Sequence, residues 1–249
     1  MEEEFPGPRT AIVTGGAKRI GEALVRALSA DGWHVLIHFN RSAAEAERLA
    51  GELDHAAIVM AELGDPDCAQ RIMARLEDLP PARLLVNSAS QFGHDGQDDF
   101  SVAQWDRHQA VNVRAPALLT QAFAARLGGA NGLVVNLLDA KLAAPNPDFY
   151  SYTISKQALA GLTELSARAL APHVRVCGIA PSVTLVSGPQ SRDNFDKVHK
   201  LNALGRGVEA EQIVAALRFI IASPTLTGQT ITLDGGLRFL SLPRDVQYL

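Results

Sequence analysis

Cysteine is scarce in this sequence, which has only Cys68 and Cys177 in 249 residues. The two lie far apart and form no Cys-x-x-Cys pair or other metal-site spacing, so we expect no bound metal. Cys177 lies within an apolar run, where a buried structural thiol is the simplest interpretation. Both cysteines are therefore expected to be reduced thiols of a cytoplasmic protein.

The chain also lacks the long runs that mark nucleic-acid-binding and membrane proteins. It has no cluster of Lys or Arg, and its formal net charge is −4, which excludes the electrostatic footprint of a nucleic-acid binder. No stretch of about 18 apolar residues is present, so a transmembrane helix is not expected. The acidic first ten residues lack the apolar centre of a signal peptide. The expected partner is a small molecule.

What the chain does have is a regular alternation of apolar, strand-like segments with segments of helical periodicity. The strand-like segments are 10–15, 34–39, 56–62, 83–89, 132–138, 174–180 and 229–234. Because they are nearly continuous apolar runs, they are typical of strands covered on both faces. The sequence predicts an α/β fold: a single-domain, Rossmann-type, doubly wound parallel sheet of about seven strands with helices on both faces.

One domain is the simplest organisation, since the sequence shows no composition break, internal repeat or low-complexity tract. We expect this domain to span 9–239, between a flexible N-terminal tail, 1–8, and a C-terminal tail, 240–249. Two helices are expected to begin with capping boxes, formed by Ser42 with Glu45 and by Ser101 with Gln104.

A glycine-rich turn joins the first predicted strand to the first predicted helix, over 14–21. Glycines such as Gly15 and Gly21 let the backbone approach a pyrophosphate at the helix N-terminus, where free N–H groups point outward. The position of the turn favours a dinucleotide site over the alternative, an ordinary strand–helix turn.

The end of the second strand predicts which dinucleotide binds. An enzyme that uses NAD places Asp or Glu there for the ribose 2′-hydroxyl, but this chain reads 38–42 as HFNRS. Arg41 suits a 2′-phosphate because its planar donors match phosphate oxygens, and Lys18 and Arg19 add positive charge. We therefore expect NADPH as the cofactor; the alternative interpretation is a solvated basic loop.

Tyr152 and Lys156 are spaced i, i+4 on a predicted helix, which places both side chains on one face. A nearby lysine cation stabilises phenolate, so we expect the pKa of Tyr152 to be lowered and the phenol to exchange a proton during catalysis. The alternative is an unrelated pair on a helix surface.

These features together resemble the short-chain dehydrogenase/reductase family over essentially the whole chain. The matching segments are 14–21, 87–90, Asn112 in Val-Asn-Val, Tyr152 with Lys156, Pro181, 227–229 and 234–236. The resemblance implies that Tyr152 is the acid/base and that Lys156 binds the nicotinamide ribose. It also implies that Asn112 holds a proton-relay water and that the protein is a homotetramer.

The chain departs from the general family at the position of its catalytic serine, where Asp139 stands. A carboxylate is a poor polariser of a ketone, because it offers acceptors where a donor is needed. It suits an N–H-rich ring, or the transfer of a proton to a ring nitrogen. The structural alternative for Asp139 is a cap just after a strand. Arg19, in place of a middle glycine, and Ser90 are further departures.

The departures are similar to those of the pteridine reductases and the bacterial dihydromonapterin or dihydrofolate reductases within the family. By that resemblance, the adenosine 2′-phosphate end meets Arg19, His38, Arg41 and Ser42, and the adenine meets Glu62 and Leu63. The full implied cofactor set is Gly15, Lys18, Arg19, Ile20, Gly21, His38, Asn40, Arg41, Ser42, Glu62, Leu63, Asn87, Ser88, Ala89, Ser90, Lys156, Pro181 and Ser182. The implied substrate contacts are Ser90, Phe92, Asp139 and Tyr152, with Phe92 stacked on the pterin ring; a plain core or loop aromatic is the alternative for Phe92.

The expected activity is hydride transfer from NADPH to a pterin, with catalytic residues Asp139, Tyr152, Lys156 and Asn112. The segment 183–207 is expected to form the substrate loop. Two arginines of this segment, Arg192 and Arg206, could meet an acidic tail such as folate glutamate. The simpler interpretation is that both are solvated surface residues. A reductase of ketones, sugars or acyl carriers and a non-catalytic NADP(H) sensor are the alternative functions.

Overall fold

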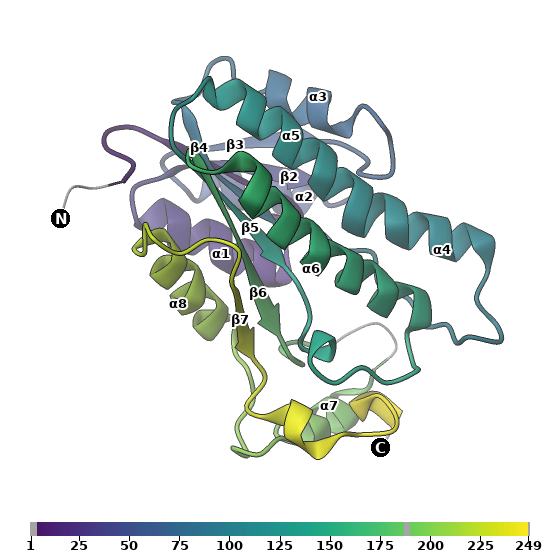
Figure 1. Cartoon of the computed structure of the whole chain (residues 1–249). Coiled ribbons are helices and arrows are strands. Elements are labelled where there is room, and N and C mark those ends of the chain that lie inside the picture. The colour runs from purple at the N-terminus through teal and green to yellow at the C-terminus, as the bar shows by residue number, and fades with distance from the viewer. Residues whose placement is uncertain (1–3, 187–189, 249) are drawn as a thin grey trace.

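The computed structural model describes residues 4–186 and 190–248, which form one α/β unit (Figure 1). Its sheet has seven strands in the order β3-β2-β1-β4-β5-β6-β7, and every neighbouring pair is parallel. The strands are β1 Thr10–Val13, β2 His34–Phe39, β3 Ala56–Met60, β4 Ala82–Asn87, β5 Gly132–Leu137, β6 Val174–Pro181 and β7 Thr230–Leu233. The predicted fold class is confirmed.

Eight α-helices and four shorter helical turns connect the strands within the described residues. The α-helices are α1 Arg19–Ala30, α2 Ala43–Gly51, α3 Cys68–Ala74, α4 Val102–Gln109, α5 Ala115–Leu127, α6 Tyr150–Leu170, α7 Arg192–Val198 and α8 Ala210–Ile221. Helices α1, α2 and α8 cover one face of the sheet, and α3, α5 and α6 cover the other (Figure 1). The short turns are η1 Ala110–Arg114, η2 Ala140–Leu142, η3 Leu237–Leu240 and η4 Val246–Tyr248.

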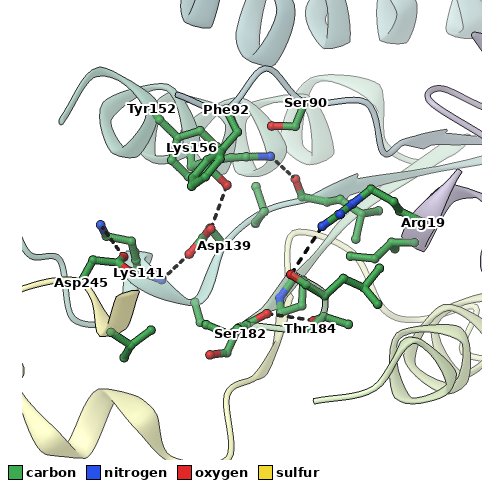
Figure 2. Close-up of a pocket in the computed structure, with 18 of the residues that line it drawn as sticks. Arg19, Ser90, Phe92, Asp139, Lys141, Tyr152, Lys156, Ser182, Thr184 and Asp245 are labelled. Carbon is green, nitrogen blue, oxygen red and sulfur yellow. Dashed lines mark hydrogen bonds and ion pairs between the residues drawn. The ribbon is translucent and has the colours of Figure 1, made fainter. Parts of the chain in front are cut away.

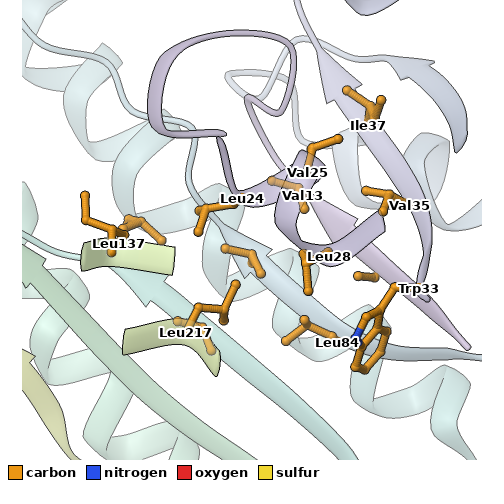
Figure 3. Close-up of a cluster of buried hydrophobic side chains, with 14 of the residues drawn as sticks. Val13, Leu24, Val25, Leu28, Trp33, Val35, Ile37, Leu84, Leu137 and Leu217 are labelled. Carbon is orange, nitrogen blue, oxygen red and sulfur yellow. The ribbon is translucent and has the colours of Figure 1, made fainter. Parts of the chain in front are cut away.

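The core lies in two layers, because successive strand residues point to opposite faces of the sheet. On the first face Val13 and Ile37 pack with Leu24 and Leu28 of α1 (Figure 3). On the second face Ile12 of the same strand joins the cluster beneath α3 and α5. This double burial accounts for the continuous apolar runs in the sequence.

Two central strands end earlier than predicted at their carboxyl ends. Strand β1 stops at Val13, although the apolar pattern extends to 15, and β4 stops at Asn87, although the pattern extends to 89. Thr14 accounts for the difference, since its Oγ1 accepts the N–H groups of Ser88 and Ala89 at 3.0 Å each. The chain leaves the sheet here because side-chain bonds replace the ladder.

Of the two predicted capping boxes, only one shows the hydrogen bond from a backbone N–H to the N-cap side chain. Ser101 Oγ accepts the Gln104 N–H at 3.2 Å, as expected. The prediction at Ser42 is wrong, since its side chain makes no cap bond with any described residue. Glu45 instead forms an ion pair with Lys18 at 2.6 Å, which draws its carboxylate away from the N-cap.

Both described chain ends pack onto the body instead of extending as free tails. Phe5 is buried and meets Trp33 edge-on, and Glu4 pairs with Arg175 at 2.6 Å. At the other end Val246 is buried beside α7. An apolar anchor in each segment accounts for this packing.

The described residues contain neither a membrane-spanning helix nor a metal-binding cluster. No helix among them is long and apolar enough to cross a membrane. No group of three or more His, Cys, Asp or Glu in the described part of the chain is placed to hold a metal. Cys68 and Cys177 are buried free thiols, and burial raises the pKa of each.

Candidate active site

Two adjoining cavities lie at the carboxyl edge of the sheet, where open parallel sheets bind ligands. One has a volume of about 700 Å³ and contains Asp139, Tyr152 and Lys156 in its wall. The other has a volume of about 1150 Å³ and contains Arg41 in its wall. Both cavities are lined by Gly15, Ala89, Ser90 and Gln91, so the glycine turn and the end of β4 form their common floor.

The glycine turn leaves no room for side chains. Gly15 has a φ of +63°, and a Cβ there would lie 3.0 Å from the Cα of Ala89. A Cβ on Gly21 would lie 2.1 Å from the carbonyl oxygen of Gly15. The turn therefore presents bare backbone at the start of α1, a fit for a dinucleotide pyrophosphate.

His38 supports this turn from below. Its ring is buried, its Nδ1 accepts the Gly15 N–H at 3.1 Å, and its Nε2 lies 3.0 Å from the carbonyl oxygen of Ala61. Burial lowers the pKa of His38, so the ring is neutral. His38 lines the larger cavity but holds the turn in place, and it is not a charged phosphate ligand.

The larger cavity is lined by His38, Arg41, Glu62 and Leu63 of the residues predicted for the adenosine end, while Ser42 and Arg19 lie outside its described lining residues. Arg41 is exposed there, and Leu63 lines the wall. Glu62 accepts the Gly64 N–H at 3.0 Å and the Asn40 amide at 2.7 Å. The Gly64 hydrogen bond is the main reason that the pKa of Glu62 is lowered.

Arg107 of α4 and Arg114 of η1 also line the larger cavity, and sequence reasoning missed both. Arg114 donates to the carbonyl oxygen of Gly64, beside Glu62. On a predicted helix, basic residues are typical of a solvated face. The sequence therefore carried no signal that these two guanidinium groups face the cofactor end.

Arg19 lines the smaller cavity and is not among the described lining residues of the larger one, so its contact with the 2′-phosphate stays a prediction. Its backbone has a φ of +56° at the start of α1, and its guanidinium donates to the carbonyl oxygen of Val186 at 2.6 Å (Figure 2). This contact holds Arg19 toward the loop after β6. Lys18 and Ile20 line the same cavity.

Asn87, predicted as a cofactor contact, lies outside the described lining residues of both cavities. It is buried at the end of β4, where its Nδ2 donates to Asn136 Oδ1 on β5 at 2.8 Å. Asn87 joins two strands beneath the floor. Ser88, Pro181 and Ser182 do line the smaller cavity, as predicted.

Asp139 and Tyr152 come from different elements and meet in the smaller cavity (Figure 2). The Tyr152 hydroxyl, in the first turn of α6, donates to Asp139 Oδ2 at 2.8 Å. Asp139 Oδ1 accepts the Lys141 N–H at 2.8 Å, so Asp139 also caps the short turn η2. The structural and functional interpretations of Asp139 are therefore compatible, with one oxygen serving each.

The two acids are difficult to ionise at this position. Burial raises the pKa of Asp139. Burial and the neighbouring Asp139 raise the pKa of Tyr152 well above 10. The expected lowering of the Tyr152 pKa is wrong, because Lys156 Nζ lies 5.7 Å from the ring centre and donates to the Leu137 carbonyl at 2.8 Å. Burial lowers the pKa of Lys156 itself to about 8.

Asn112 lies on the π-helical turn η1, a form that is frequent at functional sites. Its side chain accepts the Gln91 N–H at 2.7 Å and donates to the Gln91 carbonyl at 2.9 Å. It also donates to Ser155 Oγ on α6 at 2.9 Å. Asn112 thus ties the loop after β4 to the catalytic helix; its part in a proton relay stays a prediction.

Phe92 and Ser90 approach Tyr152 from the loop after β4 (Figure 2). The Phe92 ring meets Tyr152 edge-on at 4.8 Å and stacks on Phe149 at 4.5 Å. Phe92 remains 36% exposed, so one side of its ring is open toward the cavity. Ser90 lines both cavities and so lies where they adjoin.

The C-terminal segment closes the smaller cavity, a role the sequence did not reveal. Leu242, Asp245, Val246 and Gln247 line its wall. Asp245 lies 3.3 Å from Lys141 Nζ, which joins the segment to the loop that follows Asp139 (Figure 2). A short segment without helical or strand periodicity gives no sequence signal for such a contact.

The predicted substrate loop, 183–207, includes α7 and contributes Val183, Thr184 and Leu185 to the smaller cavity. Residues 187–189 of this loop lie outside the described residues. Arg192 pairs with Asp196 at 3.3 Å on an exposed face.

Comparison with known proteins decides the family. A family model described as short chain dehydrogenase matches residues 9–196. The chain belongs to the short-chain dehydrogenase family. This membership confirms the resemblance drawn from the glycine turn and the Tyr152–Lys156 pair, and it makes the protein an NAD(P)-dependent oxidoreductase.

Several relatives of this short-chain dehydrogenase are reductases. Pteridine reductase 1 of Leishmania tarentolae is 30% identical, with 93% of this chain and 96% of that protein covered. L-xylulose reductase of Mesocricetus auratus is 31% identical, with 92% of this chain and 96% of that protein covered.

Solved structures give a similar result. The FolM alternative dihydrofolate reductase 1 of Brucella suis, in complex with NADP, has a TM-score of 0.89 and 38% identity. The alignment covers 93% of this short-chain dehydrogenase and 95% of that chain. The corresponding Brucella canis protein, complexed with NADP, has a TM-score of 0.90 and 38% identity, with 96% and 97% covered.

Proposed function

We propose that this short-chain dehydrogenase is an NADPH-dependent reductase of a pterin ring, in the dihydromonapterin, dihydrobiopterin or dihydrofolate class. The observation that carries the proposal is the hydrogen bond between Asp139 and Tyr152, beside the half-exposed ring of Phe92. A carboxyl group whose pKa burial raises is suited to hold a proton beside a ring nitrogen. The pteridine reductase and dihydrofolate reductase relatives support this choice of substrate.

NADPH fits the bare glycine turn, where added Cβ atoms would clash with the backbone. The turn from Gly15 to Gly21 would hold the pyrophosphate, and Arg41 would meet the 2′-phosphate. Lys156 would contact the nicotinamide ribose. When bound, NADPH supplies the hydride that the reaction requires.

The side chains of the smaller cavity would then orient and protonate the substrate. Phe92 would bind the flat ring on its open face. Tyr152 would give its phenolic proton to the nitrogen of a ring C=N bond, whose carbon would receive the hydride. Because the hydroxyl has one hydrogen, its bond to Asp139 would open at this step. A solvent proton, passed on by Asp139, would then restore the Tyr152 phenol. One hydride and one proton thus convert C=N to CH–NH.

The L-xylulose reductase relative keeps a carbonyl substrate as the second candidate. Asp139 disfavours it, because carbonyl reduction needs a donor where the carboxylate offers acceptors. NADPH oxidation by the purified protein, followed by absorbance, separates the two. The panel contains dihydromonapterin, dihydrobiopterin, dihydrofolate and a set of ketones. Turnover confined to the pterins supports the proposal, and turnover confined to ketones contradicts it.

We further propose a cytoplasmic homo-oligomer, a homotetramer by family resemblance. Large apolar side chains on the surface support association, since Leu165 is 67% exposed and Phe219 is 58% exposed. Sedimentation equilibrium of the purified protein tests this, and a monomer at micromolar concentration would contradict it.

A further inference from the structure

The catalytic helix α6 begins without a cap from its own N-terminal residue. Phe149 stands at the N-cap with a φ of 56°, in the left-handed region, and its side chain makes no cap bond with any described residue. The first N–H groups of a helix have no partner within the helix, so another group must satisfy them. Tyr152 lies in this first turn, so the position of its hydroxyl depends on how the turn is held.

Asp95 supplies the missing cap from a different part of the chain. Its Oδ1 accepts the Ser151 N–H at 3.0 Å, across 56 residues of sequence. Its backbone carbonyl accepts the Tyr150 N–H at 3.1 Å. The side chain is buried, and a carboxylate at this end of a helix also faces the positive end of the helix dipole.

A second chain of hydrogen bonds strengthens this attachment. The Ser151 hydroxyl donates to Asp95 Oδ2, and Ser151 Oγ lies 2.7 Å from His108 Nδ1. Because the hydroxyl has one hydrogen and gives it to Asp95, the hydrogen between Ser151 and His108 must come from Nδ1. Both side chains are buried, and His108 Nε2 finds no partner among the described residues, as a ring nitrogen without hydrogen can tolerate.

Asp95 also belongs to the loop that brings Phe92 and Ser90 to the cavity. The Phe92 ring meets the Tyr152 ring at 4.8 Å, and Figure 2 shows the two side by side. His108 meets the same tyrosine edge-on, with ring centres 6.1 Å apart. Buried Asp95 therefore connects the loop that carries Phe92 to the helix that carries Tyr152.

We propose that Asp95 is a positioning residue: it caps α6 from the Phe92 loop and so fixes Tyr152 and Phe92 relative to each other. This inference deepens the proposed function, since it takes Tyr152 as the proton donor and Phe92 as the stacking ring. Asp95 itself touches neither, and it acts through the backbone of Ser151 and through its own loop.

The experiment compares Asp95→Ala, Asp95→Asn and the matched control Asp98→Ala, an exposed carboxylate of the same loop. Amide hydrogen exchange of 150–152 is measured without any substrate. NADPH binding is measured by titration, and turnover by the substrate of the panel that the wild type reduces fastest. Asp95→Ala is expected to bind NADPH at full stoichiometry, to exchange faster at these amides and to lose about 10- to 100-fold in kcat.

Asp95→Asn separates positioning from folding. Its amide oxygen takes over the Ser151 N–H, and its NH₂ group donates to Ser151 Oγ, which then donates to His108 Nδ1. The cap survives, kcat recovers most of its value, and the His108 hydrogen moves to Nε2, visible by nitrogen NMR of histidine-labelled protein. The kcat and the His108 tautomer of Asp95→Asn therefore test the positioning role even if Asp95→Ala does not fold.

Three results would overturn the inference. One is unchanged exchange and kcat in Asp95→Ala, equal to the Asp98→Ala control. Another is a loss of kcat in strict proportion to a loss of NADPH-binding sites, which marks a folding defect alone. The third is an unchanged His108 tautomer in Asp95→Asn. If the wild type reduces no pterin, the proposed function fails, and the exchange and tautomer results still decide the role of Asp95.

Discussion

The Tyr152 hydroxyl donates to the Asp139 carboxylate at 2.8 Å, in a buried position where both groups resist ionisation. In the wider family this position carries a serine, whose hydroxyl donates and accepts. Burial raises the pKa of both Asp139 and Tyr152, so each keeps its proton to higher pH than an exposed group of the same type would. That property suits the reduction of a C=N bond, which ends with a proton on nitrogen.

Replacing Tyr152 with Phe removes the phenolic proton and keeps the ring that packs against Phe92. We expect kcat to fall by about 10²- to 10⁴-fold, the usual contribution of a positioned general acid. NADPH binding is expected to be unchanged, as measured by titration. Turnover at the wild-type level would show that another group delivers the proton.

Replacing Asp139 with Asn is expected to stabilise the protein at neutral pH while lowering kcat by about 100-fold. Because burial raises the pKa of Asp139, the unfolded chain loses this proton at lower pH than the folded protein does. The free energy of unfolding of the wild type therefore falls as pH rises above the ordinary aspartate pKa. It stops falling once pH exceeds the pKa of Asp139 in the folded protein. Thermal melts should show the largest gain near neutral pH and a shrinking gain toward pH about 4; a gain independent of pH contradicts this account.

Replacing Arg41 with Ala tests the cofactor choice at the larger cavity. A charged hydrogen bond to the 2′-phosphate contributes about 1.5–3 kcal/mol, so KM for NADPH is expected to rise about 10- to 100-fold. KM for NADH should change little, because that cofactor lacks the phosphate. Arg71→Ala on α3, an exposed arginine paired with Asp67, is the matched control. Equal effects on the two cofactors would remove Arg41 from the 2′-phosphate site.

Replacing His38 with Leu leaves the Gly15 N–H and the Ala61 carbonyl without their partner. Each buried group left unpaired costs about 1–3 kcal/mol, so unfolding free energy should fall by about 3 kcal/mol. NADPH binding should weaken as well, since the glycine turn loses its support. Chemical denaturation and NADPH titration measure the two effects, and normal binding by a destabilised variant would separate the turn from His38.

Replacing Arg244 with Ala is expected to loosen the C-terminal segment over the smaller cavity. Arg244 lies 2.8 Å from Asp148, and the Asp245 N–H lies 2.7 Å from the same carboxylate. Although burial alone acts to raise the pKa of Asp148, the hydrogen bonds from Arg244 and Asp245 leave it below its ordinary value.

Because the Arg244 side chain is 53% exposed, its pair with Asp148 contributes about 1 kcal/mol or less. The melting temperature should fall by about 2–4 °C, and KM for the substrate should rise. Arg168→Ala, an exposed arginine paired with Glu164 on α6, is the control for a surface ion pair away from the cavity. A KM equal to that of the control would show that the segment does not affect substrate binding.

The sequence alone determined the sheet, the glycine turn and the Tyr152–Lys156 pair. Each is written in local spacing: apolar runs give buried parallel strands, glycines mark close backbone approaches, and i, i+4 neighbours share a helix face. The departure at Asp139 was also visible, since it stands at a fixed distance before the tyrosine on the next element.

Only the tertiary structure decided where side chains point and what partners they meet. Arg19 turns toward the loop after β6, because one left-handed residue at the start of α1 redirects it. His38 is buried beneath the turn, and Asp95 caps a helix from 56 residues away. These contacts depend on segments far apart in the chain, and local periodicity carries no information about which distant groups folding brings into hydrogen-bond distance.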